Sequence, residues 1–344
     1  MKKVSLFLGM VLAASFAMAQ NTATVNQFGS NIGQVLQTGS DNGATIQQGF
    51  SGAAVSNSHA PAYAGDWIEG SYIKQIGSTN TATVTVRTSA NGTSINQEGD
   101  LNTATQDVGS TFERTTDLTK MGLDIDQIGN SNLATQKTIS SFGSYGIQGM
   151  TIKQTGMDNL ADQVSIGGMA QTQQIKQVGN NNNNSTVNAF NISTTTLANP
   201  LTALAYTFSR ANGGAAVVGL PMTQYSNQRF GSAIMNVTGD DNNTYQFQEY
   251  SVWSTSGDND EILNLTGSRN NVAQGQLGEK NYSNITLTGD ENVVSTSQLG
   301  DLNSADVDVI GSYNVVGIDQ TGNSQTATVN QNGNANFAKV VQHY

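Results

Sequence analysis

Hydrophobic and polar residues alternate along short segments of the chain, and these segments recur at a fixed spacing. In the last third, glycines repeat every 11 residues, and the fifth and seventh residues after each glycine are mostly small or β-branched. The ninth residue is mostly Gln, whereas Ser, Thr, Asn and Asp fill most intervening positions. Residues two apart share one face of a strand. The pattern therefore predicts strands of about seven residues, each with an inward apolar and amide face and a solvent side.

Each predicted strand is followed by a tight turn around glycine. Glycine tolerates the positive φ that such a turn needs, whereas other residues are strained there. The third residue after each glycine is a carboxamide and is expected to face inward. The turn glycines are Gly267, Gly278, Gly289, Gly300, Gly311, Gly322 and Gly333, and the carboxamides are Asn270, Asn281, Asn292, Asn303, Asn314, Gln325 and Asn336.

One strand-turn unit cannot bury its inward face alone, so two units are expected to face each other in a coil of 22 residues. Stacked coils pair edge to edge, and residues 22 apart then form ladders. The sequence predicts one ladder of Asn270, Asn292, Asn314 and Asn336 and a second containing Asn281 and Asn303. Inward glutamines at the ninth position include Gln298, Gln320, Gln331 and Gln342.

The predicted fold is therefore all-β: a β-solenoid with Gly turns and inward Asn and Gln ladders. A closed antiparallel barrel is the alternative, but the fixed short period disfavours it. The expected register also places Asp308 between Thr286 and Asn330, so that like charges are not stacked directly.

The chain divides into four regions. Residues 1–19 carry Lys2 and Lys3, an apolar run and Ala17-Met18-Ala19, which is typical of a cleaved signal peptide. A membrane anchor is the alternative, but the apolar run is short for a bilayer. Residues 20–187 hold irregular repeats with an insert at about 50–71, residues 188–233 form a second insert, and residues 234–344 are regular repeats. All three prolines lie in the inserts, which suits strands elsewhere.

Composition limits the classes of function. Charged residues make up 11% of the chain, against about 25% in typical globular domains. The formal net charge is -11, so nucleic acid is not an expected partner. Membrane insertion is not expected either, because no segment after residue 19 is apolar enough to cross a bilayer. Low charge with abundant Asn and Gln favours ladder-forming β structure. Cysteine is absent, so disulfides do not hold the fold.

No catalytic, metal or cofactor site is predicted. Only His59 and His343 are available for a catalytic triad, and cysteine is absent. Glu279 and Asp301 are 22 apart and could bind calcium weakly, but solvated turn acids are the simpler interpretation. Scattered aromatics such as Trp253 are expected to serve packing rather than sugar binding.

Nearly the same phrase stands near both ends of the chain. Residues 21–29 read NTATVNQFG and residues 325–333 read QTATVNQNG. The first strand, with Asn21 and Gln27, begins close to the expected cleavage site, and the last, Asn336 to Gln342, lies close to Tyr344. Exposed strand edges are templates for pairing. Two matching, uncapped ends predict head-to-tail addition of further copies.

The repeating units resemble curlin repeats. The resemblance rests on the pattern Q-x-G-x-x-N-x-A-x-x-x-Q, seen from Gln331 through Gly333, Asn336 and Ala338 to Gln342, and on Gln75-Ile-Gly77-Ser-Thr-Asn80-Thr-Ala82. Curlins are the secreted subunits of curli, the bacterial functional amyloid of biofilms. The resemblance implies export through an outer-membrane pore, fibre assembly outside the cell with other curlin-type subunits, and a role in adhesion.

The resemblance leaves the kind of subunit open. The two inserts depart from the family pattern, so the chain could be a major subunit or a nucleator. The second hypothesis is a monomeric β-solenoid adhesin or glycan-binding surface protein, with the inserts as its binding elements. A solenoid enzyme is the third, and the residues do not favour it.

Overall fold

The computed structural model describes residues 20–49, 55–57, 70–87, 91–110, 121–140, 148–166, 171–183, 224–227, 231–249 and 258–343. The predicted signal peptide, most of both predicted inserts, His59 and Trp253 lie outside the described residues.

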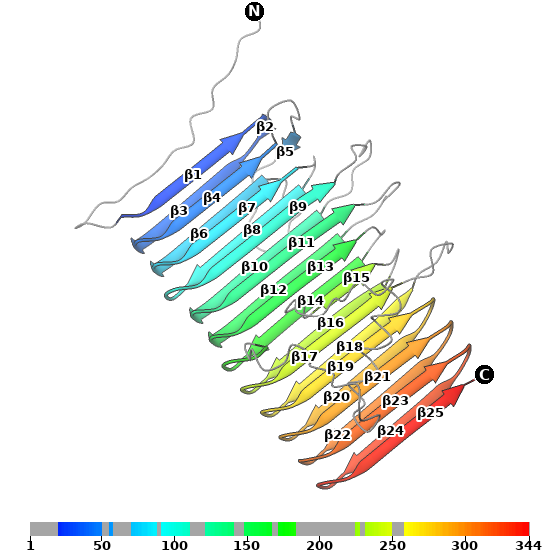
Figure 1. The fold of residues 1–344 in the computed structure, drawn as a ribbon. Helices are drawn as coiled ribbons and strands as arrows, with labels where there is room; N and C mark the ends of the chain where they lie inside the picture. The colour runs from blue at the N-terminus through cyan, green and yellow to red at the C-terminus, as the bar shows by residue number, and fades with distance from the viewer. Residues whose placement is uncertain are drawn as a thin grey trace, which may run out of the picture.

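Two long sheets face each other along the molecule (Figure 1). The larger, 12-stranded sheet has the order β1 (Thr22–Gln27), β4 (Gly43–Gln48), β7 (Thr81–Val86), β9 (Thr103–Ser110), β11 (Leu133–Ser140), β13 (Leu160–Ile166), β15 (Gln224–Asn227), β17 (Asn243–Glu249), β19 (Asn271–Leu277), β21 (Val293–Leu299), β23 (Val315–Thr321) and β25 (Phe337–His343). The smaller, 11-stranded sheet runs from β3 (Gly33–Ser40) through β6 (Gly70–Ser78), β8 (Asn91–Glu98), β10 (Met121–Asn130), β12 (Gln148–Met157), β14 (Gln171–Val178), β16 (Gly231–Thr238), β18 (Asn259–Thr266), β20 (Tyr282–Thr288) and β22 (Ser304–Ile310) to β24 (Thr326–Asn332).

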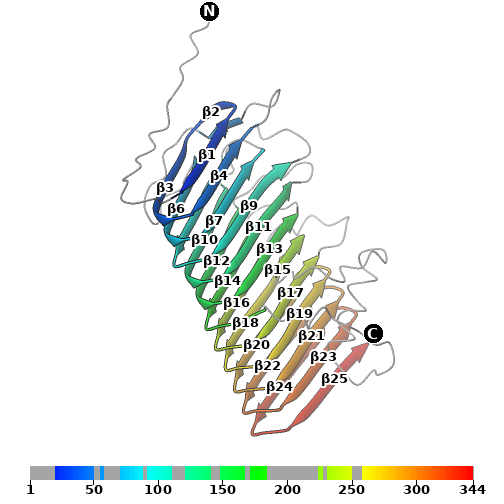
Figure 2. The same cartoon turned by 60° about the vertical axis from the view of Figure 1, so that its left-hand side comes forward.

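Every strand pair in the described part of the chain is parallel, including the short pair β2 (Gly29–Asn31) and β5 (Val55–Asn57). The chain alternates between the two long sheets, so each coil adds one strand to each sheet, and the colours advance steadily along the stack (Figure 2). The predicted β-solenoid is confirmed, and the antiparallel barrel is excluded.

The core lies between the two sheets. Inward residues of β4 alternate with outward ones, and Ile46 is fully buried. Amide side chains such as Gln75 and Asn80 are equally buried among the aliphatic residues. The predicted register of residues 22 apart is confirmed in β20, β22 and β24, where Asp308 pairs with Thr286 and Asn330.

The predicted solvent side is wrong for part of the larger sheet. Ala273 of β19 and Ser295 and Ser297 of β21 occupy outward positions, yet all three are buried. The sheet face above these small residues is therefore covered. Alternation of polar and apolar residues cannot predict this burial, because it distinguishes only the two sides of a single strand.

The predicted second insert, 188–233, overlaps two strands of the stack. Strand β15 and the beginning of β16 lie inside those bounds but belong to the two long sheets. In β15, Gln224 pairs with Gln163 on one side and with Gln246 on the other. A strand of 4 residues is too short for its alternation to be visible in the sequence. The first insert likewise contains β5 and the first two residues of β6, Gly70 and Ser71.

The two edges of the solenoid differ. At the glycine edge, defined as the turns that lead from the smaller to the larger sheet, tight glycine turns recur from Gly39 to Gly333. At the opposite edge, which leads from the larger to the smaller sheet, such turns occur at Gly278, Gly300 and Gly322. Before β18, most of the gaps between described strands fall in connections at this second edge, whereas the longest gap, 184–223, falls in the connection from β14 to β15 at the glycine edge.

Candidate functional site: side-chain ladders and the ends of the stack

The turn glycines stack directly on one another at the glycine edge. Gly289 has a φ of 135°, and a Cβ added to it would lie 1.9 Å from the carbonyl oxygen of Gly311 in the next coil. The same overlap recurs in coil after coil, with Gly311 facing the carbonyl of Gly333 at 2.0 Å. Glycine is therefore needed both for its φ and for the close approach of neighbouring turns.

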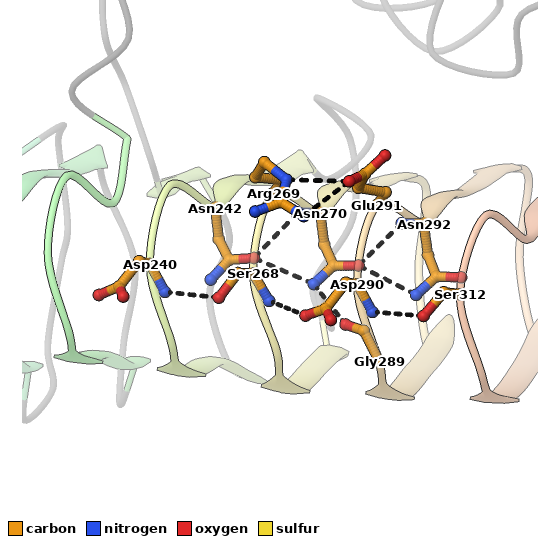
Figure 3. Close-up of polar contacts among 10 residues, drawn as sticks. All are labelled: Asp240, Asn242, Ser268, Arg269, Asn270, Gly289, Asp290, Glu291, Asn292 and Ser312. Atoms are coloured by element: carbon orange, nitrogen blue, oxygen red, sulfur yellow. Dashed lines mark hydrogen bonds and ion pairs between the residues drawn. The ribbon is translucent and has the colours of Figure 1, made fainter.

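A continuous asparagine ladder lines the inner side of the glycine edge. The backbone N–H and Nδ2 of Asn292 both donate to Oδ1 of Asn270, at 2.9 and 3.0 Å, and Asn270 donates in the same way to Asn242 (Figure 3). Nδ2 of Asn270 also donates to the carbonyl of Gly289 in the next turn at 2.8 Å. The ladder comprises Asn21, Asn42, Asn80, Asn102, Asn132, Asn159, Asn182, Asn242, Asn270, Asn292, Asn314 and Asn336.

An outer column runs beside this ladder, and in it acidic residues alternate with neutral ones. The backbone N–H of Ser268 donates to Oδ1 of Asp290 at 2.8 Å, and that of Asp240 donates to the Ser268 hydroxyl at 3.3 Å (Figure 3). Ser312 accepts from Asp290 in turn. The column therefore satisfies turn amides without placing two aspartates in contact. Arg269 and Glu291 form an exposed ion pair alongside it.

The opposite edge carries a shorter ladder. Nδ2 and the backbone N–H of Asn281 donate to Oδ1 of Asn259, and the backbone N–H of Asn303 donates to Oδ1 of Asn281. Gln325 then takes the place of an asparagine, and its backbone N–H donates to Oδ1 of Asn303 at 3.0 Å. The sequence predicted that Asn281 and Asn303 form a ladder distinct from that of Asn270 and Asn292, but it did not predict that this second ladder begins at Asn259.

Glutamine ladders run through the interior with a uniform polarity. Where a second glutamine follows in the next coil toward the C-terminus, Nε2 of the first donates to its Oε1, as in Gln298 to Gln320 and Gln320 to Gln342, both at 2.9 Å. The second Nε2 hydrogen reaches a backbone carbonyl of the facing sheet, such as Tyr282 O for Gln298. The smaller sheet has its own ladder of Gln37, Gln75, Gln97, Gln127, Gln154 and Gln177.

The ladders are incomplete at both ends of the described chain. Oε1 of Gln325 and Oε1 of Gln331, on or just before β24, are buried without a hydrogen-bond partner. At the other end, Gln27 donates to Gln48, and the inward Val25 is 41% exposed. Its equivalent in the next coil, Ile46, is fully buried. Both end faces thus present inward residues that are covered everywhere else in the stack.

Sequence reasoning missed two polar features of the interior. Asn183 has a φ of 59°, and its side-chain Oδ1 accepts from the backbone N–H of Thr244 at 2.7 Å. This amide replaces a backbone acceptor where the larger sheet is interrupted before β15. Glu261 of β18 is fully buried between the sheets, and desolvation raises its pKa well above the usual range. Asn183 lies in a run of asparagines, and Glu261 follows Asp258 and Asp260, so neither residue stands out from its neighbours in the sequence.

The described residues contain no cluster of three or more His, Cys, Asp or Glu that could hold a metal ion. Asp301 instead accepts a hydrogen bond from the backbone N–H of Glu279 at 2.9 Å, which is a turn function. His343 lies in the last strand. Within the same residues, no helix has the length and apolar character needed to cross a membrane.

A family comparison adds to this geometry. Residues 289–322, from the turn before β21 to the turn after β23, match the family model of the curlin associated repeat. The chain carries a curlin repeat. The match supports the resemblance to the curlin family seen in the sequence, and it covers the part of the stack in which both edges have glycine turns. A comparison with curated proteins gave no match.

Proposed function

We propose that this chain is a secreted structural protein that self-assembles head to tail into extracellular, curli-like amyloid fibres of a biofilm matrix and thereby supports adhesion. Its partners are other copies of itself and other curlin-type subunits, and it reaches the cell exterior through an outer-membrane secretion pore. The curlin repeat at residues 289–322 supports this assignment.

The observation that carries the proposal is the open state of both ends of the ladders. Strands β1 and β3 at one end, and β24 and β25 at the other, have no further neighbour among the described residues. Each offers a row of unpaired backbone donors and acceptors, which is a template for another strand. The inward side chains on both end faces are amides and small aliphatics, as in the interior, so a second copy continues the same core.

The ladders supply the driving force in this proposal. A satisfied hydrogen bond contributes about 0.5–1.5 kcal/mol net, whereas a buried unsatisfied group costs about 1–3 kcal/mol. The buried Oε1 of Gln325 is such a group in a single chain. When a second copy stacks on the first, unpaired end groups such as this one gain hydrogen-bond partners, and the exposed Val25 becomes covered. Residues 1–19 serve export, and their removal leaves β1 close to the new N-terminus.

The test is assembly of protein that lacks residues 1–19. It is expected to bind an amyloid dye, to form fibres by electron microscopy, and to give the cross-β reflections at about 4.7–4.8 Å and about 10 Å. A protein that stays monomeric without these reflections would contradict the proposal, and glycan binding by that monomer would favour the adhesin hypothesis.

A matched pair of variants links assembly to the end face. Val340 faces inward and packs against the core cluster, whereas Val341 of the same strand faces outward and is 46% exposed. Val340→Lys places a charge between the sheets at the last strand and is expected to block elongation. Val341→Lys adds the same charge on the outside and is expected to assemble. Equal assembly by both variants would contradict growth through this face.

A further inference from the structure

The two long sheets differ in strand number, and this difference determines how two copies can meet. The larger sheet has 12 strands and the smaller has 11, so the described stack holds 12 + 11 = 23 strands, an odd number. Strand β1 begins the stack in the larger sheet, and β25 ends it in the same sheet, half a coil beyond β24. The described part of the solenoid therefore ends on a half coil.

A second copy in the same orientation cannot continue both sheets. If its β1 paired with β25, its β3 would lie half a coil further along, and the smaller sheet would lack one strand above β24. A copy rotated by half a turn about the stack axis leaves no gap. Its β1 then pairs with β24 and its β3 pairs with β25, which is the order that the winding of the chain requires.

We propose that consecutive copies in the fibre are related by a half turn, with β1 of one copy on β24 and β3 on β25 of the preceding copy. This inference rests on the proposed function and specifies its interface. The partner is a second copy of this chain, and each face of the fibre presents the larger and the smaller sheet in alternation.

The residues brought together by the half turn agree with this register. Strand β1 reads TATVNQ, and β24 contains the same letters in the same order, TATVNQ, followed by Asn332. Ala23 then lies on Ala327, Val25 on Val329 and Gln27 on Gln331, as in the interior, where Ala44 pairs with Ala82. Beyond the β1 strand, Gly29 at the start of β2 comes to lie over Gly333.

Hydrogen-bond polarity fits the same arrangement. Within the ladders, glutamines donate through Nε2 toward the C-terminal neighbour, so Gln342 presents a donor at the end face. In the second copy, Oε1 of Gln27 and Oε1 of Gln37 face the junction, because both residues direct Nε2 inward to Gln48 and Gln75. Asn21 of the second copy meets Gln325, where its backbone N–H can reach the buried, unpaired Oε1.

Cysteine pairs test the register, because the chain has no cysteine of its own. Thr24 and Thr328 face outward and are exposed, and the half turn places them on neighbouring strands about 4.8 Å apart, a separation that a disulfide can span. The variant with Thr24→Cys and Thr328→Cys is expected to give covalent multimers from oxidised fibres on a non-reducing gel. The control with Thr24→Cys and Lys339→Cys, which samples stacking without rotation, is expected to remain monomeric on the same gel.

The outcomes separate the two proposals. Multimers from the control but not from the Thr24 and Thr328 pair would overturn the half turn in favour of direct stacking. Fibres that cross-link in neither variant would overturn this register while leaving fibre formation intact. Absence of fibres from the unsubstituted protein would overturn the proposed function itself. Cryo-electron microscopy of unsubstituted fibres provides a second measurement: a half turn between consecutive copies is expected, and a common orientation would refute it.

Discussion

Two glycines in the same turn position separate the effect of backbone conformation from that of stacking. Gly311 and Gly333 have φ values of 125° and 118°. A Cβ at Gly311 would lie 2.0 Å from the Gly333 carbonyl oxygen, whereas a Cβ at Gly333 would meet only Nδ2 of Asn336, at 3.4 Å. Gly311→Ala must therefore displace the next turn, and Gly333→Ala need not do so in a single chain.

The magnitude follows from the bonds at that turn. Strain from a positive φ costs about 1–3 kcal/mol in both variants. In Gly311→Ala, displacement also disrupts the bond from Gly333 N–H to Ile310 O and the bond from Asn314 Nδ2 to Gly333 O, both 2.9 Å long. Two lost bonds and an unpaired buried group add about 2–6 kcal/mol. Gly311→Ala is thus expected to cost about 2–6 kcal/mol more than Gly333→Ala.

Hydrogen-exchange mass spectrometry of the unassembled protein measures this difference, because stability in a repeat stack is local. Gly311→Ala is expected to lower amide protection across β22 to β25, and Gly333→Ala is expected to lower it less, through backbone strain alone. In the fibre, Gly333→Ala should slow elongation, because Gly29 of the next copy lies above it. Equal losses of protection in the two unassembled variants would refute the stacking argument.

Three further changes test other parts of the account. Gln298→Ala removes two ladder bonds and one bond to Tyr282 O and should destabilise the stack by about 2–4 kcal/mol in denaturant titrations; a loss below about 0.5 kcal/mol would contradict the ladder energetics. The raised pKa of Glu261 means that the unfolded chain loses this proton first, near pH 4.3, so stability should fall as pH rises above that value, by up to about 1.4 kcal/mol per pH unit. Glu261→Gln should remove this part of the slope, and an unchanged slope would show that Glu261 is ionised in the fold. Ser268→Asp would stack three acids with Asp240 and Asp290, so it should weaken the fold at low salt and recover at high salt, whereas Ser268→Asn should do neither; salt-independent melting of Ser268→Asp would count against the column.

The regular part of the stack was predictable because one 11-residue unit carries its own turn, ladder and core positions. Gly289, Asn292 and Gln298 occupy the places that their spacing indicates, in the register that stacking of residues 22 apart requires. The alternation of residues within each unit identifies its inward face, and the 22-residue spacing identifies which residues of adjacent coils lie next to each other. In this region, the sequence pattern of one unit is therefore sufficient to predict both its strand and its packing against the adjacent coils.

The remaining features depend on contacts that no short pattern encodes. Strand β15 is held by its neighbours on both sides rather than by its own alternation, so the sequence does not distinguish it from the predicted insert around it. Asn183 acts through a local φ of 59° that its sequence context does not reveal. The covered positions Ala273 and Ser295 reflect packing on the outside of the sheet. The odd strand count required the complete topology.

The central claim is that the amide-lined column of one molecule continues without a break into the next. Cryo-electron microscopy of fibres grown from protein lacking residues 1–19, at a resolution that shows side chains, tests it most directly. With 23 strands in two sheets, each molecule should advance the fibre by about 55 Å, with both sheets and the glutamine ladders continuous across every junction. Fibres built from side-by-side solenoids, or a gap in either sheet between consecutive molecules, would contradict the account.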